Sequence, residues 1–264
     1  LTRSEQLAEY IPEGKIVVSE SGIRDNQTVR RIGGHANAFL VGSQLTSQPD
    51  IDLAARRLVY GDNKVCGLTS WTAAQAARAA GAVYGGLIFE EASPRNVSRE
   101  TAQNIIAHEP DLLYVAVSRR TSNIEELALD GIHAIQLHAP YQGSVETERA
   151  LIEEASKHSN HVWRAIDMTA PHAPELVAAL ADVADLLVLD TGSGGTGETF
   201  DWSTVPAGIP ALLAGGLNLT NLEQALAVGT IGLDLNSGLE TPRGKDSGLI
   251  ARAFSTIRNY KKQY

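Results

Sequence analysis

The sequence predicts an α/β fold: a (β/α)8 barrel of the TIM-barrel type, preceded by two extra βα units. Short runs rich in Val, Ile and Leu alternate with helix-like stretches along the 264 residues. The runs are apolar almost without interruption, which is typical of parallel strands covered on both faces. Eight of the ten runs lie from residue 64 onward, and about 200 residues are enough to close a small barrel.

Each of the ten runs is a candidate strand. The two that precede the barrel are 15–20 and 38–42. The eight of the barrel are 64–68, 83–89, 112–118, 134–138, 162–167, 185–190, 210–215 and 232–236.

Helical composition and spacing follow these runs. The clearest helices are expected over 72–80, 144–158, 220–228 and 246–262. Thr220 is a candidate N-cap and Gly229 a C-terminal stop. Lys261 and Lys262 are favourable beside the C-terminal end of the last helix.

Two domains are therefore expected, 1–62 and 63–264. A lone two-stranded unit is marginally stable and has open edges. We expect residues 1–62 to dock on the barrel, to pair with another copy, or to be the remainder of a missing domain. The chain begins with Leu1 and its single methionine is Met168. A native start is normally Met, so we expect a fragment, a processed product or an edited version.

Composition narrows the class of protein. A hydrophobic content of 43% supports a sizeable core, and the net charge of −9 argues against nucleic acid or an anionic membrane as the main partner. One cysteine cannot form an internal disulfide, and no apolar run approaches the ~18 residues of a membrane helix. We see no signal peptide, and we predict a cytoplasmic protein.

Two reactive side chains stand at the ends of candidate strands, Cys66 after KV and Asp190 after LLVL. Barrels of this type place their chemistry at the C-terminal ends of the strands. A thiol and a carboxylate there are a candidate base and acid, although the thiol, with a pKa of about 8.5, needs a positive neighbour to ionise at neutral pH. The alternatives are a buried apolar cysteine and a structural, hydrogen-bonded aspartate.

Glycine-rich loops predict a phosphate site after the last two strands, where barrels often bind phosphate. Its candidate residues are Gly215, Gly216, Asn236, Ser237 and Gly238. The stretch 192–197 formally matches G-x-G-x-x-G, but no helix opens directly after it and no acidic residue ends the next strand, so we reject a dinucleotide site. We interpret its Gly194 and Gly195 as part of a phosphate-facing or closing segment.

Three further residues are candidates for substrate binding. Arg95, after the second barrel strand, presents a planar fork that suits a carboxylate. His138 ends the fourth barrel strand and Asp234 lies in the eighth. The alternatives are a solvated loop arginine, a strand cap and a core carboxylate. The other histidines show no zinc-binding spacing, and we predict no metal site.

A set of motifs resembles phosphoribosylanthranilate isomerase, the single-barrel enzyme of tryptophan biosynthesis. They run in strand order from about Asn63 to the C-terminus. The motifs are KVCGLT (64–69), GGLIF (85–89), SPR (93–95), QLH (136–138), LDT (189–191), GGTG (194–197), LAGGL (213–217) and GLDLNSG (232–238).

Residues 1–62 resemble instead the last two βα units of indole-3-glycerol phosphate synthase, through VSESGI (18–23) and AFLVGS (38–43). The two enzymes are fused in this order in enteric bacteria, and 56–64 looks like the junction. The earlier synthase strands, which carry its catalytic lysines, are absent. We therefore expect no synthase activity from this chain, and a contact with a synthase domain.

The resemblance implies an Amadori rearrangement of N-(5′-phosphoribosyl)anthranilate to 1-(2-carboxyphenylamino)-1-deoxyribulose 5-phosphate, without a cofactor. Asp190 would protonate the ring oxygen and Cys66 would take the C2 proton. Arg95 would face the anthranilate carboxylate, and the phosphate would lie after strands seven and eight. The partner is thus a small phosphorylated sugar–anthranilate.

Four positions depart from the family pattern and leave pocket shape and substrate range open: Ser118, Ala139, Arg164 and Asn236. Three alternatives also stay open. The first is a related isomerase of histidine biosynthesis, which resembles a two-aspartate site. The second is a non-catalytic barrel that stabilises a synthase. The third is the C-terminal part of a bifunctional synthase–isomerase.

Overall fold

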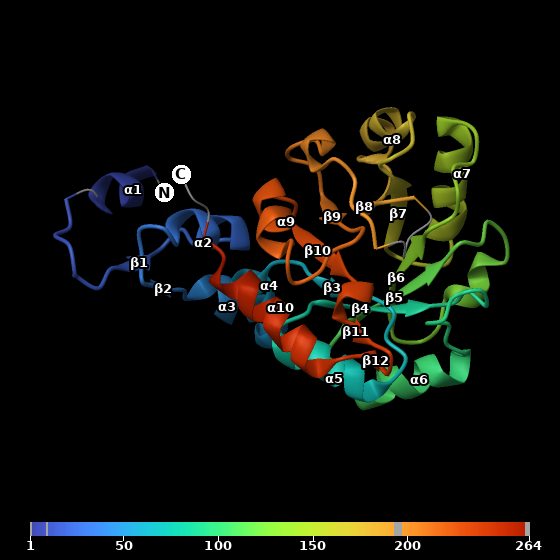
Figure 1. Ribbon diagram of the computed structural model, residues 1–264, viewed down its shortest axis with the longest axis horizontal. Coiled ribbons are helices and arrows are strands. Elements are labelled where there is room, and N and C mark those ends of the chain that lie inside the picture. The colour runs from blue at the N-terminus through green and yellow to red at the C-terminus, as the bar shows by residue number, and fades with distance from the viewer. Residues whose placement is uncertain (1, 9, 193–196, 262–264) are drawn as a thin grey trace.

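The computed structural model describes residues 2–8, 10–192 and 197–261 and confirms the barrel. Eight parallel strands close in the order β10-β3-β4-β5-β6-β7-β8-β9 (Figure 1). In chain order they are β3 (Lys64–Val65), β4 (Tyr84–Ile88), β5 (Leu113–Ser118), β6 (Ile132–Leu137), β7 (Val162–Asp167), β8 (Leu186–Asp190), β9 (Ala211–Leu213) and β10 (Gly232–Leu235).

The strands are apolar on both faces because each face meets a different core. Inside the barrel, side chains such as Val115, Val117 and Val188 pack against one another. Outside, residues such as Leu87 and Leu187 pack against the surrounding helices. Successive residues of a strand point to opposite faces, so an uninterrupted apolar run fills both cores.

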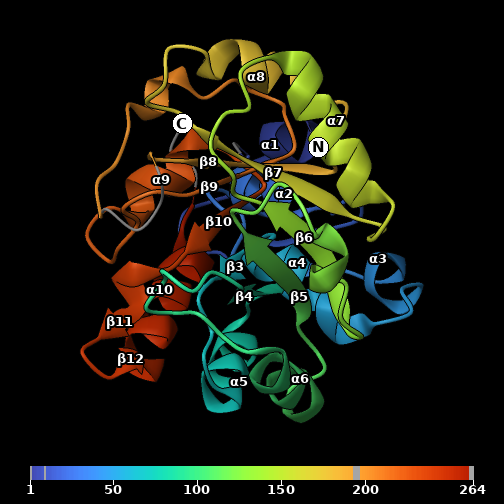
Figure 2. The ribbon, with the colours of Figure 1, turned by 90° about the vertical axis from the view of Figure 1, so that its right-hand side faces the viewer.

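Helices surround the barrel (Figure 2). They are α5 (Trp71–Ala80), α6 (Arg99–His108), α7 (Val145–Ser156), α8 (Ala173–Leu180), α9 (Leu222–Val228) and α10 (Ser247–Asn259), with the 3₁₀ turns η1 (Ile124–Leu127), η2 (Trp202–Thr204) and η3 (Ser237–Leu239). Side-chain caps from Ser70, Ser98, Ser144 and Asp246 begin α5, α6, α7 and α10. None of the described helices is long and apolar enough to cross a membrane.

Some local expectations are corrected. The βα alternation is incomplete, since η1 connects β5 to β6 and η2 connects β8 to β9. Thr220 is not an N-cap: α9 begins at Leu222 after Asn221, because the Thr220 hydroxyl bonds the Asn218 side chain (Oγ1 to Oδ1, 2.6 Å) in a local turn. The last helix ends at Asn259 rather than at residue 262. A short hairpin, β11 (Glu240–Thr241) and β12 (Gly244–Lys245), follows η3 and was not expected.

Residues before the barrel form α1 (Thr2–Ala8), β1 (Val18–Glu20), α2 (Asn26–Ile32), β2 (Ala38–Leu40), α3 (Ser43–Thr46) and α4 (Ile51–Tyr60). β1 and β2 pair in parallel as an isolated two-stranded sheet. Its own small core consists of Ile23, Ile32, Ala36 and Leu58. The predicted pair of βα units is therefore present as a separate sheet beside the barrel (Figure 1).

Helix α4 joins this N-terminal segment to the end of the barrel at which the strands begin. The buried Arg56 guanidinium donates to the carbonyl oxygens of Ala82 and Asp111, which precede β4 and β5. Asn26 of α2 donates through Nδ2 to the carbonyls of Leu58 and Val59 at the end of α4, each at 3.0 Å. The segment thus docks at the N-terminal ends of the barrel strands, away from the end where barrel enzymes place their chemistry.

Candidate active site

A cavity of about 620 Å³ opens at the C-terminal ends of the barrel strands. Parallel strands end at one face, so side chains that are far apart in sequence meet there. The residues predicted for the site that line this cavity are Cys66, Arg95, His138, Asp190, Gly215, Gly216, Asp234, Asn236 and Ser237. Gly238 follows Ser237 in η3 but is not part of the lining, while Gly194 and Gly195 lie outside the described residues.

Cys66 follows β3 directly and continues its ladder, since its amide donates to the carbonyl of Leu235 at 2.8 Å. Gly67 then turns the chain with φ of 72°. Gly86 on β4 makes room for the thiol, because a Cβ there would lie 2.6 Å from the Cys66 Sγ and 2.9 Å from the Lys64 Cε. The side chain of Cys66 is buried in the barrel interior and reaches the cavity.

Lys64 is a neighbour of Cys66 that the sequence did not single out. Its side chain is fully buried, and its Nζ lies 2.8 Å from Asp234 Oδ2 and 3.3 Å from Cys66 Sγ. It also donates to Gln136 Oε1 at 2.8 Å. A strand alternates its faces, so a lysine two residues before Cys66 had to point into the barrel with it, and that spacing was the available signal. Asp234, left open between pocket and core, lines the cavity and pairs with Lys64.

The environment of Cys66 favours the thiol. Burial raises its pKa, the charge of Lys64 opposes that rise, and the carboxylate of Asp234 adds to it. The pKa of Lys64 is itself raised: burial acts to lower it, but the Asp234 carboxylate and the Cys66 sulfur together outweigh burial. The positive neighbour that the sequence required is therefore present, yet it reduces the effect of burial without cancelling it.

Asp190 ends β8 on the other side of the barrel. Its Oδ1 accepts the amide of Thr191 at 2.7 Å, and its Oδ2 lies 3.5 Å from His138 Nε2. Burial raises the pKa of Asp190 to about 7. A carboxyl group with this pKa is partly protonated at neutral pH, which is the state that a general acid needs.

His138 follows β6 and stands between Gln136 and Asp190. Its Nδ1 lies 3.2 Å from Gln136 Nε2. Burial lowers the pKa of His138 to about 4, and the positive charges of Lys64, Arg164 and Arg119 act in the same direction. The ring is therefore neutral near pH 7.

Arg95 reaches the cavity, but its fork already holds a carboxylate of the same chain. Its Nε and Nη2 donate to the two oxygens of Glu240 at 2.8 and 2.7 Å, and Lys245 contacts the same carboxylate. The side chain crosses the turn after Cys66, where a Cβ on Gly67 would lie 2.6 Å from Arg95 Cδ. The hairpin β11–β12 supplies Glu240, a partner that no local pattern indicated.

The glycine loops at the predicted phosphate end are closely packed. Gly215 and Gly216 have φ of 82° and 63°. Added Cβ atoms there would lie 2.2 Å from Thr191 Oγ1 and 2.6 Å from the backbone of Glu198. Both the backbone conformation and the close approach therefore require glycine. Within the described residues, no three His, Cys, Asp or Glu side chains gather closely enough to hold a metal ion.

Two family models match consecutive parts of the chain. The family model of N-(5′-phosphoribosyl)anthranilate (PRA) isomerase matches residues 63–256, and that of indole-3-glycerol phosphate synthase matches residues 1–58. The tryptophan biosynthesis protein TrpCF of Corynebacterium glutamicum is 60% identical over 98% of this chain and 57% of its own length. That of Vibrio cholerae is 41% identical over 98% and 55%. The chain thus spans little more than half the length of these curated relatives.

Solved structures resemble the barrel. Phosphoribosyl anthranilate isomerase from Thermus thermophilus is 28% identical, with a TM-score of 0.63 over 74% of this chain and 98% of its own. Another such isomerase, in complex with reduced 1-(o-carboxyphenylamino)-1-deoxyribulose 5-phosphate, is 26% identical, with a TM-score of 0.60 over 76% and 98%. The family model covers well over half of the 264 residues. The chain therefore belongs to the N-(5′-phosphoribosyl)anthranilate isomerase family and carries, ahead of that domain, a segment of indole-3-glycerol phosphate synthase.

Proposed function

We propose that this barrel catalyses the Amadori rearrangement of N-(5′-phosphoribosyl)anthranilate to 1-(2-carboxyphenylamino)-1-deoxyribulose 5-phosphate. The observation that carries the proposal is the pairing of a thiol after β3 with a carboxyl group of pKa about 7 at the end of β8, in one cavity. The relative solved with a reduced form of this product supports the substrate class.

In the first step, Asp190 protonates the ring oxygen as the furanose opens to a Schiff base. Cys66, as thiolate, then takes the C2 proton, and the resulting enolamine tautomerises to the ketone. Asp190 ends as carboxylate and Cys66 as thiol, so the two groups exchange a proton with their surroundings before the next turnover. A positioned acid and base typically contribute about 10²–10⁴-fold each.

Binding of the substrate would use both ends of the cavity. The loops after β9 and β10 would hold the phosphate, and Arg95 would meet the anthranilate carboxylate. Because Glu240 already holds the Nε and Nη2 atoms of Arg95, the incoming carboxylate must displace Glu240 or bind at Nη1. Glu240→Gln weakens the internal pair, and we expect it to lower KM.

The test follows the loss of anthranilate-type fluorescence as freshly made substrate is consumed. We expect fast turnover by the wild type and a loss of about 10²-fold or more in kcat for Cys66→Ser and for Asp190→Asn. Asp185→Asn is the matched control, because it makes the same change just before β8, at the opposite end of that strand, where the side chain caps the amide of Val162 (2.8 Å). Absence of turnover by the wild type would contradict the proposal and favour a non-catalytic barrel that stabilises a synthase.

The pH profile of kcat/KM gives a second test. The active form needs Asp190 protonated and Cys66 ionised. Because the pKa of the acid lies below that of the base, the fraction of enzyme in this form rises with pH up to the lower pKa and falls above the higher one. We therefore expect the low-pH limb near 7, at the pKa of the Asp190 carboxyl. The high-pH limb should lie above the ordinary thiol range, since burial raises the pKa of Cys66. A profile that stays flat from pH 6 to 8 would contradict this assignment.

We also propose that residues 1–62 are the last two βα units of a synthase barrel, that residues 63–264 are the isomerase domain, and that the chain corresponds to the C-terminal part of a bifunctional synthase–isomerase. The synthase match over residues 1–58 and the greater length of the relatives support this division. Intact mass of the natural protein tests it: a mass near 28.1 kDa, that of this chain alone, would contradict the fusion.

A further inference from the structure

A chain of polar side chains crosses the barrel interior from Cys66 to Asp190. Lys64 Nζ contacts Cys66 Sγ at 3.3 Å and Gln136 Oε1 at 2.8 Å. Gln136 Nε2 lies 3.2 Å from His138 Nδ1, and His138 Nε2 lies 3.5 Å from Asp190 Oδ2. Three side chains from β3 and the end of β6 thus connect the proposed base with the proposed acid.

The hydrogen-bond donors and acceptors of these side chains are compatible with one arrangement of protons. A lysine ammonium group donates and has no acceptor, so the amide oxygen of Gln136 must face it. The amide nitrogen of Gln136 then donates to His138 Nδ1. A neutral imidazole carries one proton, and Nδ1 is used as an acceptor here. The proton of His138 is therefore on Nε2, which faces Asp190.

The His138 ring does not obtain its Nε2 proton by becoming positively charged. Lys64, Arg164 and Arg119 surround His138 with positive charge and, together with burial, keep it neutral. Asp190 faces Asp234, Lys64 and Asp167 besides His138. The N–H that His138 presents to Asp190 therefore depends on its tautomer, which Gln136 controls.

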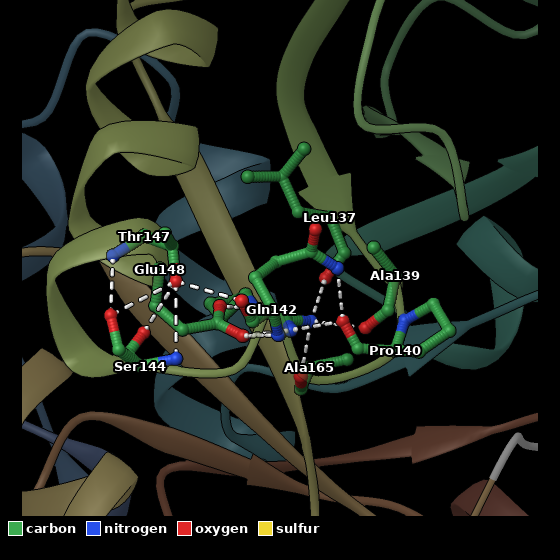
Figure 3. Close-up of polar contacts among 9 residues, drawn as sticks. Leu137, Ala139, Pro140, Gln142, Ser144, Thr147, Glu148 and Ala165 are labelled. Atoms are coloured by element: carbon green, nitrogen blue, oxygen red, sulfur yellow. Dashed lines mark hydrogen bonds and ion pairs between the residues drawn. The ribbon is translucent and has the colours of Figure 1, made fainter.

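The backbone on either side of His138 is held separately, by a buried ion pair behind the strands (Figure 3). Arg164 of β7 donates through Nη1 to the carbonyls of Leu137 and Ala139, on either side of His138, at 3.1 and 2.8 Å. Its Nε and Nη2 donate to the two oxygens of Glu148 of α7 at 2.6 and 3.0 Å. The backbone that carries His138 is thus held independently of Gln136.

We infer that Lys64 is a positioning residue that couples the two proposed catalytic groups: its ammonium group faces the Cys66 thiol and, through Gln136, it holds His138 as the tautomer whose Nε2–H faces Asp190. The inference rests on the proposed isomerase function, because Cys66 and Asp190 are its base and acid. In this arrangement the donor from His138 stabilises the carboxylate that Asp190 becomes after it has given up its proton.

Nitrogen-15 NMR of the imidazole rings tests the inference without any turnover. The wild type should show His138 with Nε2 protonated and Nδ1 bare, the signal being assigned by its loss in His138→Gln. Gln136→Glu keeps the shape and the acceptor for Lys64 but replaces the donor to Nδ1 with a second acceptor. We expect Nδ1 of His138 to gain a proton in that variant. Gln103→Glu, on the exposed face of α6, is the matched control.

Kinetics supply the second measurement. Gln136→Met removes the amide and leaves the ion pair of Lys64 with Asp234 in place. His138 then loses its fixed tautomer, Asp190 loses a donor to its carboxylate, and the low-pH limb of kcat/KM should move up by about one pH unit. The fall in activity should appear in kcat, with KM nearly unchanged, because the Gln136 amide is not among the groups proposed to bind substrate.

The outcomes separate the two proposals. A wild-type His138 with its proton on Nδ1, or a Gln136→Glu variant with Nδ1 still bare, would overturn the inference whatever the activity. An unshifted low-pH limb in Gln136→Met would overturn the coupling to Asp190. A wild type that turns over no substrate would instead overturn the proposed function, and the NMR result would still decide the tautomer.

Discussion

The barrel and the N-terminal segment are built from the same βα pattern and differ in closure. All five residues of β4 in the barrel are buried, whereas in the three-residue β1 of the N-terminal segment only Ser19 is buried. The side chains of Ile16, Val18 and Leu40 are 83%, 49% and 59% exposed. Closing the sheet removes its edges and covers both faces. The pattern of one strand therefore predicts its type, but the number of strands decides whether it is buried.

Closure also decides where both members of an ion pair can be buried. The barrel buries Lys64 with Asp234 and Arg164 with Glu148. In the N-terminal segment, Arg31 and Glu5 pair with 40% and 28% of their side chains exposed. Charges removed from water interact strongly and shift the pKa of their neighbours. The proton-transfer chemistry that we propose thus belongs to the closed part of the molecule.

The largest expected contrast between the two regions comes from breaking one ion pair in each. Glu148→Ala leaves the Arg164 charge buried without its partner and should lower the free energy of unfolding by about 3–5 kcal/mol. Glu5→Ala breaks the exposed pair with Arg31 and should cost less than about 1 kcal/mol. Urea unfolding of both variants measures the difference. Equal losses would show that closure does not change the worth of an ion pair here.

A smaller effect concerns the stability that the barrel loses by burying Asp190. The pKa of Asp190 is about 7 when folded and near its ordinary 3.8 when unfolded. The folded state therefore binds the proton more tightly, and ionisation of Asp190 costs stability as pH rises from about 4 to 7. The cost is complete above 7 and is at most about 4 kcal/mol. Asp190→Asn should remove it, so the variant gains on the wild type across this range.

Asp167 of β7 is the matched control for that measurement, because it lies in register with Asp190. Its pKa is lowered: burial acts to raise it, but hydrogen bonds from Thr169 and Gly192 outweigh burial. Asp167→Asn should therefore lose stability relative to the wild type as pH rises through the acid range. Thermal unfolding at pH 4, 5.5 and 7.5 measures both variants. A gap of the same sign for both would contradict the assigned role of burial at Asp190.

The sequence predicted the parts that depend on local periodicity. Cys66 and Asp190 were found because parallel strands end at one face, so their positions in their own strands sufficed. The partner of Arg95 was not found, since Glu240 lies 145 residues away in a hairpin of two-residue strands. Gln136 and Asp234 lie 72 and 170 residues from Lys64. Only the register of the closed sheet brings such side chains together, and no single strand encodes that register.

The smallest expected effect tests what covers the open sheet. Leu40 of β2 is 59% exposed, so Leu40→Ser in this chain should change the free energy of unfolding by no more than about 0.5 kcal/mol. In the longer natural protein that we propose, the preceding synthase units would bury this side chain. The same substitution should then cost about 1–3 kcal/mol, the value of one covered leucine. Urea unfolding of both lengths measures it. An equally small effect in the longer protein would mean that the face of β2 stays open, and that the segment does not complete a synthase barrel.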